Sequence, residues 1–443
     1  MGRNVHSEAL HGFERDRHTP VSSFSSRNMF YGIIHGAFFH MATAFADPYA
    51  VLPLFLAGFT ESVVIIGLVV SLIEAVGILP QLGMARLLQR NPSRAKGSML
   101  VGIWTRCAAW GIIAALAWRY TSPGVGMLAL FALLVSLYSL GGGIAVLPFK
   151  QVIAQTIRPE RRSSFFGWRL LAGGILAGLA GVIVKFVLGG ASLSWPRNYG
   201  VLFLFSFLCL AVAYIAMSRL RFPLVLEEMP QATIPFGAQM RHALQHYPVL
   251  KRLVLVRLLS GGLTLAFPFL TLYATRELGI TLGWVGLFVV AQRGGAILSN
   301  FIWMPLGNRR GTRMVIVSGM ALASLGLATM TVLHSPLTIA FAVALSGAGM
   351  SAMSVGFNGY ILELGVPEVR PLLFALEGTL LMPLYFMPLL GGWVVSQFGY
   401  RSVLLTGVVM LLGGLALALT LCEPRRHDPG CGPRSSGPMG DAI

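Results

Sequence analysis

The sequence predicts an all-α integral membrane protein, built from twelve transmembrane helices in two pseudo-symmetric six-helix bundles. Composition is one reason, because 55% of the 443 residues are hydrophobic and only 11% are charged, against roughly a quarter charged in soluble proteins. A second reason is that apolar stretches recur from Phe30 to Cys422, each of about twenty residues and so able to cross a hydrocarbon layer of about 30 Å. A weak repeat between the two halves is the third.

The bounds of the expected spans follow from these apolar stretches. They are 29–57, 63–86, 97–118, 124–148, 164–188, 199–219, 252–275, 283–305, 313–333, 337–361, 371–396 and 402–421. The longest hydrophilic interruption, from Arg219 to Arg252, separates six spans from six. The expected divisions are a cytoplasmic tail (1–28), an N-terminal bundle (29–219), a cytoplasmic linker (220–251), a C-terminal bundle (252–421) and a disordered cytoplasmic tail (422–443). Residues 234–247 of the linker have the pattern of an amphipathic helix on the inner membrane surface.

The net charge of +17 reflects membrane topology and does not indicate a nucleic-acid partner. Of the 33 Lys and Arg residues, 25 fall on the side that holds both termini and the even-numbered connections, and 5 fall on the other side. This asymmetry follows the positive-inside rule and predicts a multi-pass protein of the bacterial inner membrane with both termini in the cytoplasm. The basic clusters are expected to meet lipid head groups of the bilayer.

Several classes of chemistry have no support in the sequence. The polar first 28 residues lack the apolar core of a cleavable signal peptide. The four cysteines, Cys107, Cys209, Cys422 and Cys431, lack metal-ligand spacing and are expected to be unpaired thiols. We expect no metal, no cofactor and, in the absence of a G-x-x-x-x-G-K-[ST] loop, no direct use of ATP.

Two aligned segments indicate that the halves are a duplication. Residues 67–90 align without a gap on 286–309 with seven identities, and 159–169 align on 367–377 with four. The first alignment places Arg293 on Glu74, and the second places Glu377 on Arg169. Each pair therefore holds a charged residue in both halves, with the sign reversed.

Polar residues recur at intervals of seven along two of these spans. They are Gly67, Glu74 and Gln81 in span 2, and Gly286, Arg293, Asn300 and Gly307 in span 8. Seven residues are close to two helical turns, so each set forms one stripe on its helix. Such a stripe would be costly against lipid, so we expect it to face a partner helix or an aqueous cavity.

Intramembrane polar residues supply the candidates for substrate binding or proton coupling. They are Glu74, Arg293, Glu377, Arg169, Asp47, His40, Gln81 and Asn300. For Glu74 and Arg293 the alternative is a buried ion pair or a helix-packing network without contact to a solute. Glu74 could also carry a proton, whereas an arginine keeps its charge at accessible pH. Arg169 either serves the site or extends to the inner head groups.

Asp47 precedes Pro48, and this pair also signals a helix start, with a capping carboxylate followed by a residue suited to the first turn. Span 1 is therefore expected to break there. Asp47 is either the cap of the outer half-helix or an ion or proton site beside unwound backbone. His40 lies seven residues earlier on the same face and could pass on a proton.

Two further arginines lie within spans. Arg106 in span 3 is a candidate for an intramembrane charge pair with a carboxylate of its own half, Glu74 being the nearest choice. Arg257 follows Lys251 and Arg252 by about one turn and is expected to extend toward the head groups. Prolines in spans 2, 7 and 11 are either hinges or ordinary residues of membrane helices.

With these features, the chain resembles the major facilitator superfamily of transporters over about residues 28–421. The turn WMPLGNRRGTR (303–313) is similar to that family's signature G-x-L-x-D-R-x-G-x-R. The matching residues of this expected gate turn are Leu306, Arg309, Gly311 and Arg313. Asn308 stands where the family has an acid, and the counterpart after span 2 has Gln89 there.

The resemblance also implies an arrangement. Spans 2 and 11 would pack together across a central cavity, as would spans 5 and 8. Glu74 and Glu377 would then lie on one side, and Arg169 and Arg293 on the other.

The function expected from these features is secondary active transport of a small organic solute, anionic or zwitterionic, by alternating access. Protons or another ion are candidates for coupling, and the protein is expected to be a monomer. The alternatives are a non-transporting assembly or receptor protein on the same fold, or a membrane-embedded enzyme, for which the sequence offers no catalytic constellation. We therefore do not expect an enzyme.

Overall fold

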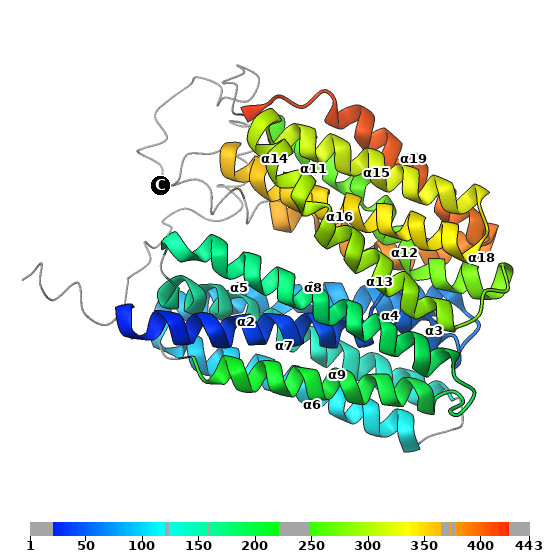
Figure 1. The fold of residues 1–443 in the computed structure, drawn as a ribbon, viewed down its shortest axis with the longest axis horizontal. Coiled ribbons are helices and arrows are strands. Elements are labelled where there is room, and N and C mark those ends of the chain that lie inside the picture. Colours follow the sequence, from blue (N-terminus) through cyan, green and yellow to red (C-terminus); the bar gives the residue numbers. More distant parts are fainter. Residues whose placement is uncertain are drawn as a thin grey trace, which may run out of the picture.

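The computed structural model describes residues 21–119, 124–157, 159–220, 248–364, 373 and 377–424. Within these ranges the regular structure is helical, and the helices run roughly parallel to one another in two groups, one from each half of the chain (Figure 1). The all-α membrane fold predicted from the sequence is confirmed. Most of each tail and most of the linker, including the amphipathic segment 234–247, lie outside the described residues, but α2 begins at Val21, inside the expected N-terminal tail.

The N-terminal bundle is formed by the helices that derive from spans 1 to 6. In order they are α2 (Val21–Phe45), α3 (Val51–Leu56), α4 (Val63–Ala75), η1 (Val76–Ile78), α5 (Leu79–Arg90), η2 (Pro92–Arg94), α6 (Ala95–Arg119), α7 (Val125–Thr156), α8 (Pro159–Gly189) and α9 (Arg197–Ser218). Its core is formed where α2 packs on α8 and α9, and α6 packs on α7 and α9.

The C-terminal bundle repeats this plan. Its elements are α11 (Pro248–Ser260), α12 (Gly262–Leu272), η3 (Tyr273–Glu277), α13 (Gly283–Leu298), α14 (Asn300–Arg310), α15 (Thr312–Val332), α16 (Pro336–Leu364), η4 (Met382–Phe386), α18 (Met387–Phe398) and α19 (Tyr400–Ala418). Here α15 packs on α16 and α19, and α13 packs on α16.

Eleven helical segments of the described chain are long and apolar enough to cross a membrane, and they correspond to expected spans 2 to 12. The first expected span is interrupted, because α2 ends at Phe45 and α3 begins at Val51. The break predicted at Asp47 is therefore present. Together α2 and α3 supply the twelfth crossing.

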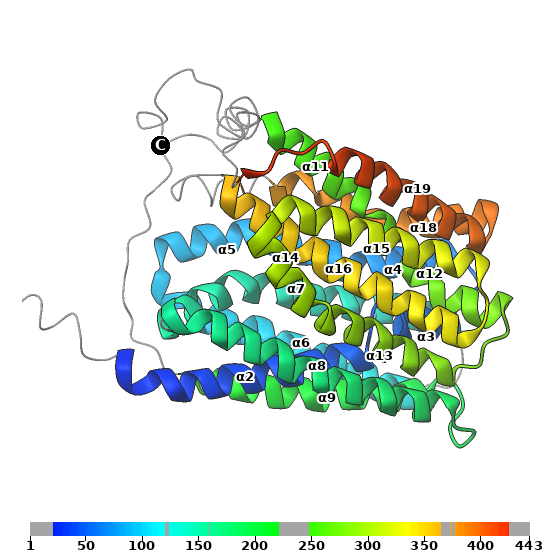
Figure 2. The same cartoon turned by 45° about the horizontal axis from the view of Figure 1, so that its top comes forward.

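The two bundles pack against each other mainly toward one end, which we call the far end. The far end is where α3 ends and where α4 and α13 begin. The opposite end, which we call the basic end, holds Val21 and the turn at Gly311. Across the interface α4 packs on α18, α8 on α13, and α3 on α12. Figures 1 and 2 both show the C-terminal bundle lying along the N-terminal one, with α13 beside α8. The helix pairing implied by the family resemblance is thus observed.

Glycines allow this close approach. A Cβ at Gly67 of α4 would lie 2.3 Å from the carbonyl oxygen of Pro388 in α18. A Cβ at Gly286 of α13 would lie 2.2 Å from the backbone nitrogen of Lys185 in α8. The first members of both polar stripes therefore face the other bundle, as the spacing of seven predicts.

The cysteine expectation is partly wrong. Cys107 and Cys209 are buried free thiols, as expected. Cys422, expected to be unpaired, is disulfide-bonded. Its backbone carbonyl also accepts a hydrogen bond from the Tyr360 hydroxyl at 2.8 Å, which holds this segment against α16.

Candidate functional site

A cavity of about 520 Å³ lies beside the interruption of the first span. Most of its wall comes from the N-terminal bundle, and Arg293 and Tyr385 contribute from the C-terminal bundle. Pro48, Tyr49 and Leu52 bound it toward the far end. The predicted site residues on its wall are Glu74, Arg293, His40, Gln81 and Arg106.

Asp47 organises the break between α2 and α3. Its Oδ1 accepts hydrogen bonds from the backbone nitrogens of Tyr49 and Ala50, both at 3.0 Å. Its carbonyl oxygen accepts from the nitrogens of Val51 and Leu52. The carboxylate therefore caps the N-terminus of α3, where a negative charge also suits the helix dipole.

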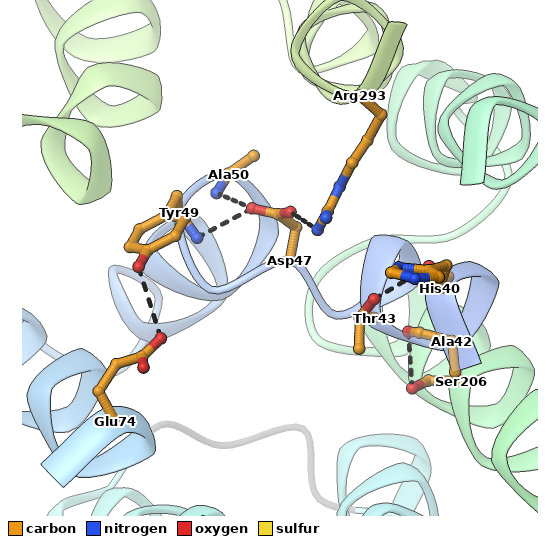
Figure 3. Close-up of polar contacts among 9 residues, drawn as sticks. All are labelled: His40, Ala42, Thr43, Asp47, Tyr49, Ala50, Glu74, Ser206 and Arg293. Carbon is orange, nitrogen blue, oxygen red and sulfur yellow. Dashed lines mark hydrogen bonds and ion pairs between the residues drawn. The ribbon is translucent and has the colours of Figure 1, made fainter. Parts of the chain in front are cut away.

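Asp47 has a second role, which joins the two bundles. Its Oδ2 lies 2.8 Å from Nη2 of Arg293 on α13, and the Asp47 side chain is fully buried (Figure 3). The Arg293 side chain is 29% exposed, and its Nε is buried with no hydrogen-bond partner among the described residues. Arg293 thus points inward, as predicted, and keeps donors for a further ligand.

Glu74 lies on the other side of Tyr49. The Tyr49 hydroxyl donates to Oε1 of Glu74 at 3.5 Å, a long hydrogen bond. Figure 3 shows Arg293, Asp47, Tyr49 and Glu74 as a continuous row of polar contacts. The two charged residues that the repeat aligned are therefore joined through Asp47 and Tyr49, and do not form a pair with each other.

The remaining candidates on the cavity wall make local contacts. Gln81 donates to the carbonyl oxygen of Gly77 at 3.1 Å. Arg106 donates to the Tyr138 hydroxyl at 2.5 Å and lies over the Phe39 and Tyr138 rings. The expected pairing of Arg106 with Glu74 is wrong, because this guanidinium contacts a hydroxyl and two aromatic faces instead. Its Nε is buried without a hydrogen-bond partner among the described residues.

Arg169 and Glu377 are not among the residues that line this cavity. Arg169 donates to the carbonyl oxygen of Gly32 at 3.2 Å and lies 2.8 Å from Nδ1 of the buried His35. Glu377 lies 3.3 Å from Nε of Arg257. The expectation that Arg257 extends to the head groups is wrong, because a buried carboxylate of its own bundle lies within reach.

Asn300 also points away from the cavity. The helix of span 8 divides at Ser299 into α13 and α14, and beyond this point the stripe turns toward its own bundle. The Oδ1 of Asn300 accepts a hydrogen bond from the Ser351 hydroxyl of α16 at 3.3 Å. Only the outer part of the stripe, with Gly286 and Arg293, faces the other bundle.

A carboxylate from a distant part of the chain lies beside the gate turn. Oε2 of Glu423 accepts a hydrogen bond from the backbone nitrogen of Arg313 at 3.1 Å, at the start of α15. The Arg313 guanidinium donates to the carbonyl oxygen of Leu419. A buried acid from the segment after α19 thus lies beside the turn in which Asn308 replaces the family's acid.

Replacing Gly311 by alanine is expected to destabilise this turn. Gly311 has φ +91°, a conformation that L-residues rarely adopt. An added Cβ would also lie 2.1 Å from the Glu423 carboxyl carbon. We expect the apparent free energy of unfolding in detergent to fall by about 1–3 kcal/mol, measured as a lower melting temperature. Gly97, which has open space around it, provides the control Gly97→Ala, and equal melting of the two variants would contradict this account.

Sequence reasoning missed Tyr49, Tyr138 and Glu423. Tyr49 directly follows the Asp-Pro pair, and this position was the available signal. Tyr138 and Glu423 carry no pattern that separates them from other aromatic or span-end residues, so only the packing of distant segments reveals them. Within the described ranges, His, Cys, Asp and Glu do not gather in groups of three or more that could hold a metal ion.

The C-terminal half matches a known family directly. Residues 253–438 match the model of the Major Facilitator Superfamily, and the described N-terminal half repeats the same six-helix plan. The C-terminal half of the chain is thus similar to the Major Facilitator Superfamily. The multi-pass membrane architecture inferred from composition is the architecture of this family.

Comparisons with individual proteins give a partial sequence match and solved structures of similar fold. Over 162 residues the chain is 30% identical to the multidrug resistance protein MdtH of Citrobacter koseri, a match that covers 34% of this chain and 38% of the relative. The chain is 12% identical to the solved structure of a bacterial homologue of the human lysosomal transporter Spinster, in an inward-facing conformation, with a TM-score of 0.66 and coverage of 93% and 99%. Similarity to the nucleoside transporter NupG has a TM-score of 0.68 at 13% identity, with coverage of 88% and 99%.

Proposed function

We propose that this protein is a secondary transporter that moves a small organic solute by alternating access. The observation that carries the proposal is the cavity between the two bundles, with Glu74 and Arg293 on its wall. A cavity at the interface of two repeats, beside a discontinuous helix, is where transporters of this architecture bind their solutes. The inner membrane is the proposed location, with both termini in the cytoplasm.

The proposed orientation also indicates to which side of the membrane the protein is closed. The basic end carries most of the Lys and Arg residues and faces the cytoplasm under the positive-inside rule. Contacts between the bundles at Gly67 and Gly286 close the far end. The protein is then in a state closed to the outside, from which rocking of the bundles would open the far end.

The proposed solute is anionic or zwitterionic. The Arg293 side chain is partly exposed, and its Nε has no hydrogen-bond partner within the described part of the chain. This guanidinium therefore suits an anionic group such as a carboxylate. Glu74, held by one long hydrogen bond, suits a cationic group or a coupled proton. A zwitterion that spans Tyr49 would contact both Arg293 and Glu74, so a zwitterion is our first candidate for the solute.

A ligand screen by thermal stabilisation tests this function. A solute at 100 times its dissociation constant stabilises the folded protein by about 2.7 kcal/mol, so purified protein should melt at a higher temperature with zwitterionic or anionic solutes. The Glu74→Gln variant should lose most of the response to zwitterions and keep the response to anions. Asn358→Ala, an exposed change on α16, should behave as the wild type.

Uptake into proteoliposomes then decides between transport and binding alone. The solute that stabilises the protein should accumulate in vesicles, and an imposed proton gradient tests the coupling. Binding without uptake under any gradient would favour the receptor alternative. If neither binding nor uptake occurs for solutes of either charge class, the proposed site is wrong.

A further inference from the structure

We infer that α3 is the element by which the far end is held closed, because two arginines of the C-terminal bundle contact it at its two ends. At its start, Arg293 binds Asp47, the residue that caps α3. At its finish, Nη2 of Arg276 donates to the carbonyl oxygen of Ala57 at 3.5 Å. We call these two contacts the arginine clasp of α3.

The six residues of α3 are all buried. The helix packs on α12 of the C-terminal bundle, but its aromatic contacts are with the N-terminal bundle. The Phe55 ring packs against the rings of Tyr199 and Phe203, at centroid distances of 5.4 Å and 4.8 Å. The indole nitrogen of Trp195 donates to the carbonyl oxygen of Phe55 at 3.3 Å. When the bundles rock apart, α3 must therefore move with the N-terminal bundle and leave the arginines behind.

The charges of the clasp suit the two ends of a helix. The Asp47 carboxylate lies at the N-terminus, where backbone N–H groups need acceptors, and the Arg276 cation lies at the C-terminus, where carbonyl groups need donors. Arg276 also contacts the hydroxyl of Tyr400, at the start of α19, at 3.4 Å. The C-terminal bundle therefore holds α3 from two separate elements, α13 and η3.

The position of α3 explains why the clasp controls access. Pro48, Tyr49 and Leu52 form the far wall of the cavity, so the solute cannot leave toward the far end while α3 remains clasped. The two contacts differ in strength, because the Asp47 carboxylate is fully buried while Arg276 is exposed and screened by water. Breaking the Asp47–Arg293 contact should therefore shift the equilibrium toward an open far end more than breaking the Arg276–Ala57 contact.

A labelling experiment tests the clasp without any solute, so its result is independent of the proposed transport. The reporter is Val63→Cys at the start of α4, a position 8% exposed whose backbone carbonyl lies against Gly392 of the other bundle. A membrane-impermeant maleimide added to the far side of oriented vesicles should label this cysteine slowly. Asp47→Asn keeps a good capping side chain but removes the charge, and it should raise the labelling rate about tenfold, an equilibrium shift of about 1.4 kcal/mol.

Arg276→Gln is the second variant, and its exposed position allows the protein to fold. It should raise the rate by a smaller factor, and the two changes together should exceed either one. Arg257→Gln is the matched control, because it removes a buried ion pair within a single bundle and should leave the rate unchanged. Unchanged labelling in both clasp variants, or an equal increase in Arg257→Gln, would overturn the inference.

Discussion

Arg293→Ala is expected to destabilise the protein more than any other single change in the cavity wall. Without the guanidinium, the fully buried Asp47 carboxylate keeps only its two capping N–H donors. Breaking one side of a buried ion pair costs about 3–5 kcal/mol. This range is an upper bound here, since opening the far end would bring water to Asp47. The measurement is the melting temperature of purified protein in detergent.

A double-mutant cycle separates the pair from general damage at position 293. The double variant Arg293→Gln with Asp47→Asn removes both charges and should regain most of the stability that each single change loses. Arg293→Lys keeps the charge without the two-pronged donor set, so we expect intermediate stability and loss of solute binding. Simple addition of the two single effects would mean that Asp47 and Arg293 do not stabilise each other.

Gly67→Leu and Gly286→Leu should each hold the far end open. The added side chains would meet backbone atoms of α18 and α8, which cannot move aside as a flexible side chain could. Overpacking of this kind costs about 1–3 kcal/mol in the closed state, which shifts the equilibrium by about 5- to 150-fold. We expect fast labelling of the Val63→Cys reporter from the far side, with little loss of melting temperature.

Gly178→Leu is the control for these two variants. Gly178 also lies on α8 but has no atom within 4 Å of an added Cβ. It should label as slowly as the reporter protein without further changes. If Gly286→Leu labels no faster than Gly178→Leu, the α8–α13 contact does not separate, and rocking about this interface is excluded.

Helix periodicity and local capping chemistry predict two features of this region. The spacing of seven through Gly286 and Arg293 placed that stripe against the other bundle, because helical geometry determines which residues share a face. The Asp-Pro pair located the break in the first span, because capping depends on neighbouring backbone atoms. Both features are local, so the chain order is sufficient to predict them.

Partner choice was not predictable in the same way. Several acids lie within plausible reach of Arg293 in the sequence, and its alignment with Glu74 does not identify the acid that binds it. Asp47 is its partner because the unwound backbone at residues 46–50 brings that carboxylate beneath α13. Such a contact, 246 residues apart in the chain, depends on how two separately folded bundles meet.

The sequence by itself thus determined the membrane class, the approximate spans, the two halves and the inward direction of Arg293, because hydrophobicity, loop charge and helical period act over short stretches of chain. The tertiary structure alone decided that Arg257 binds Glu377, that Arg106 binds Tyr138, and that Glu423 lies beside the gate turn. The physical reason is that a buried polar group must find a partner within about 3 Å. The identity of that partner depends on how helices distant in the sequence pack together, and a local sequence pattern does not predict this packing.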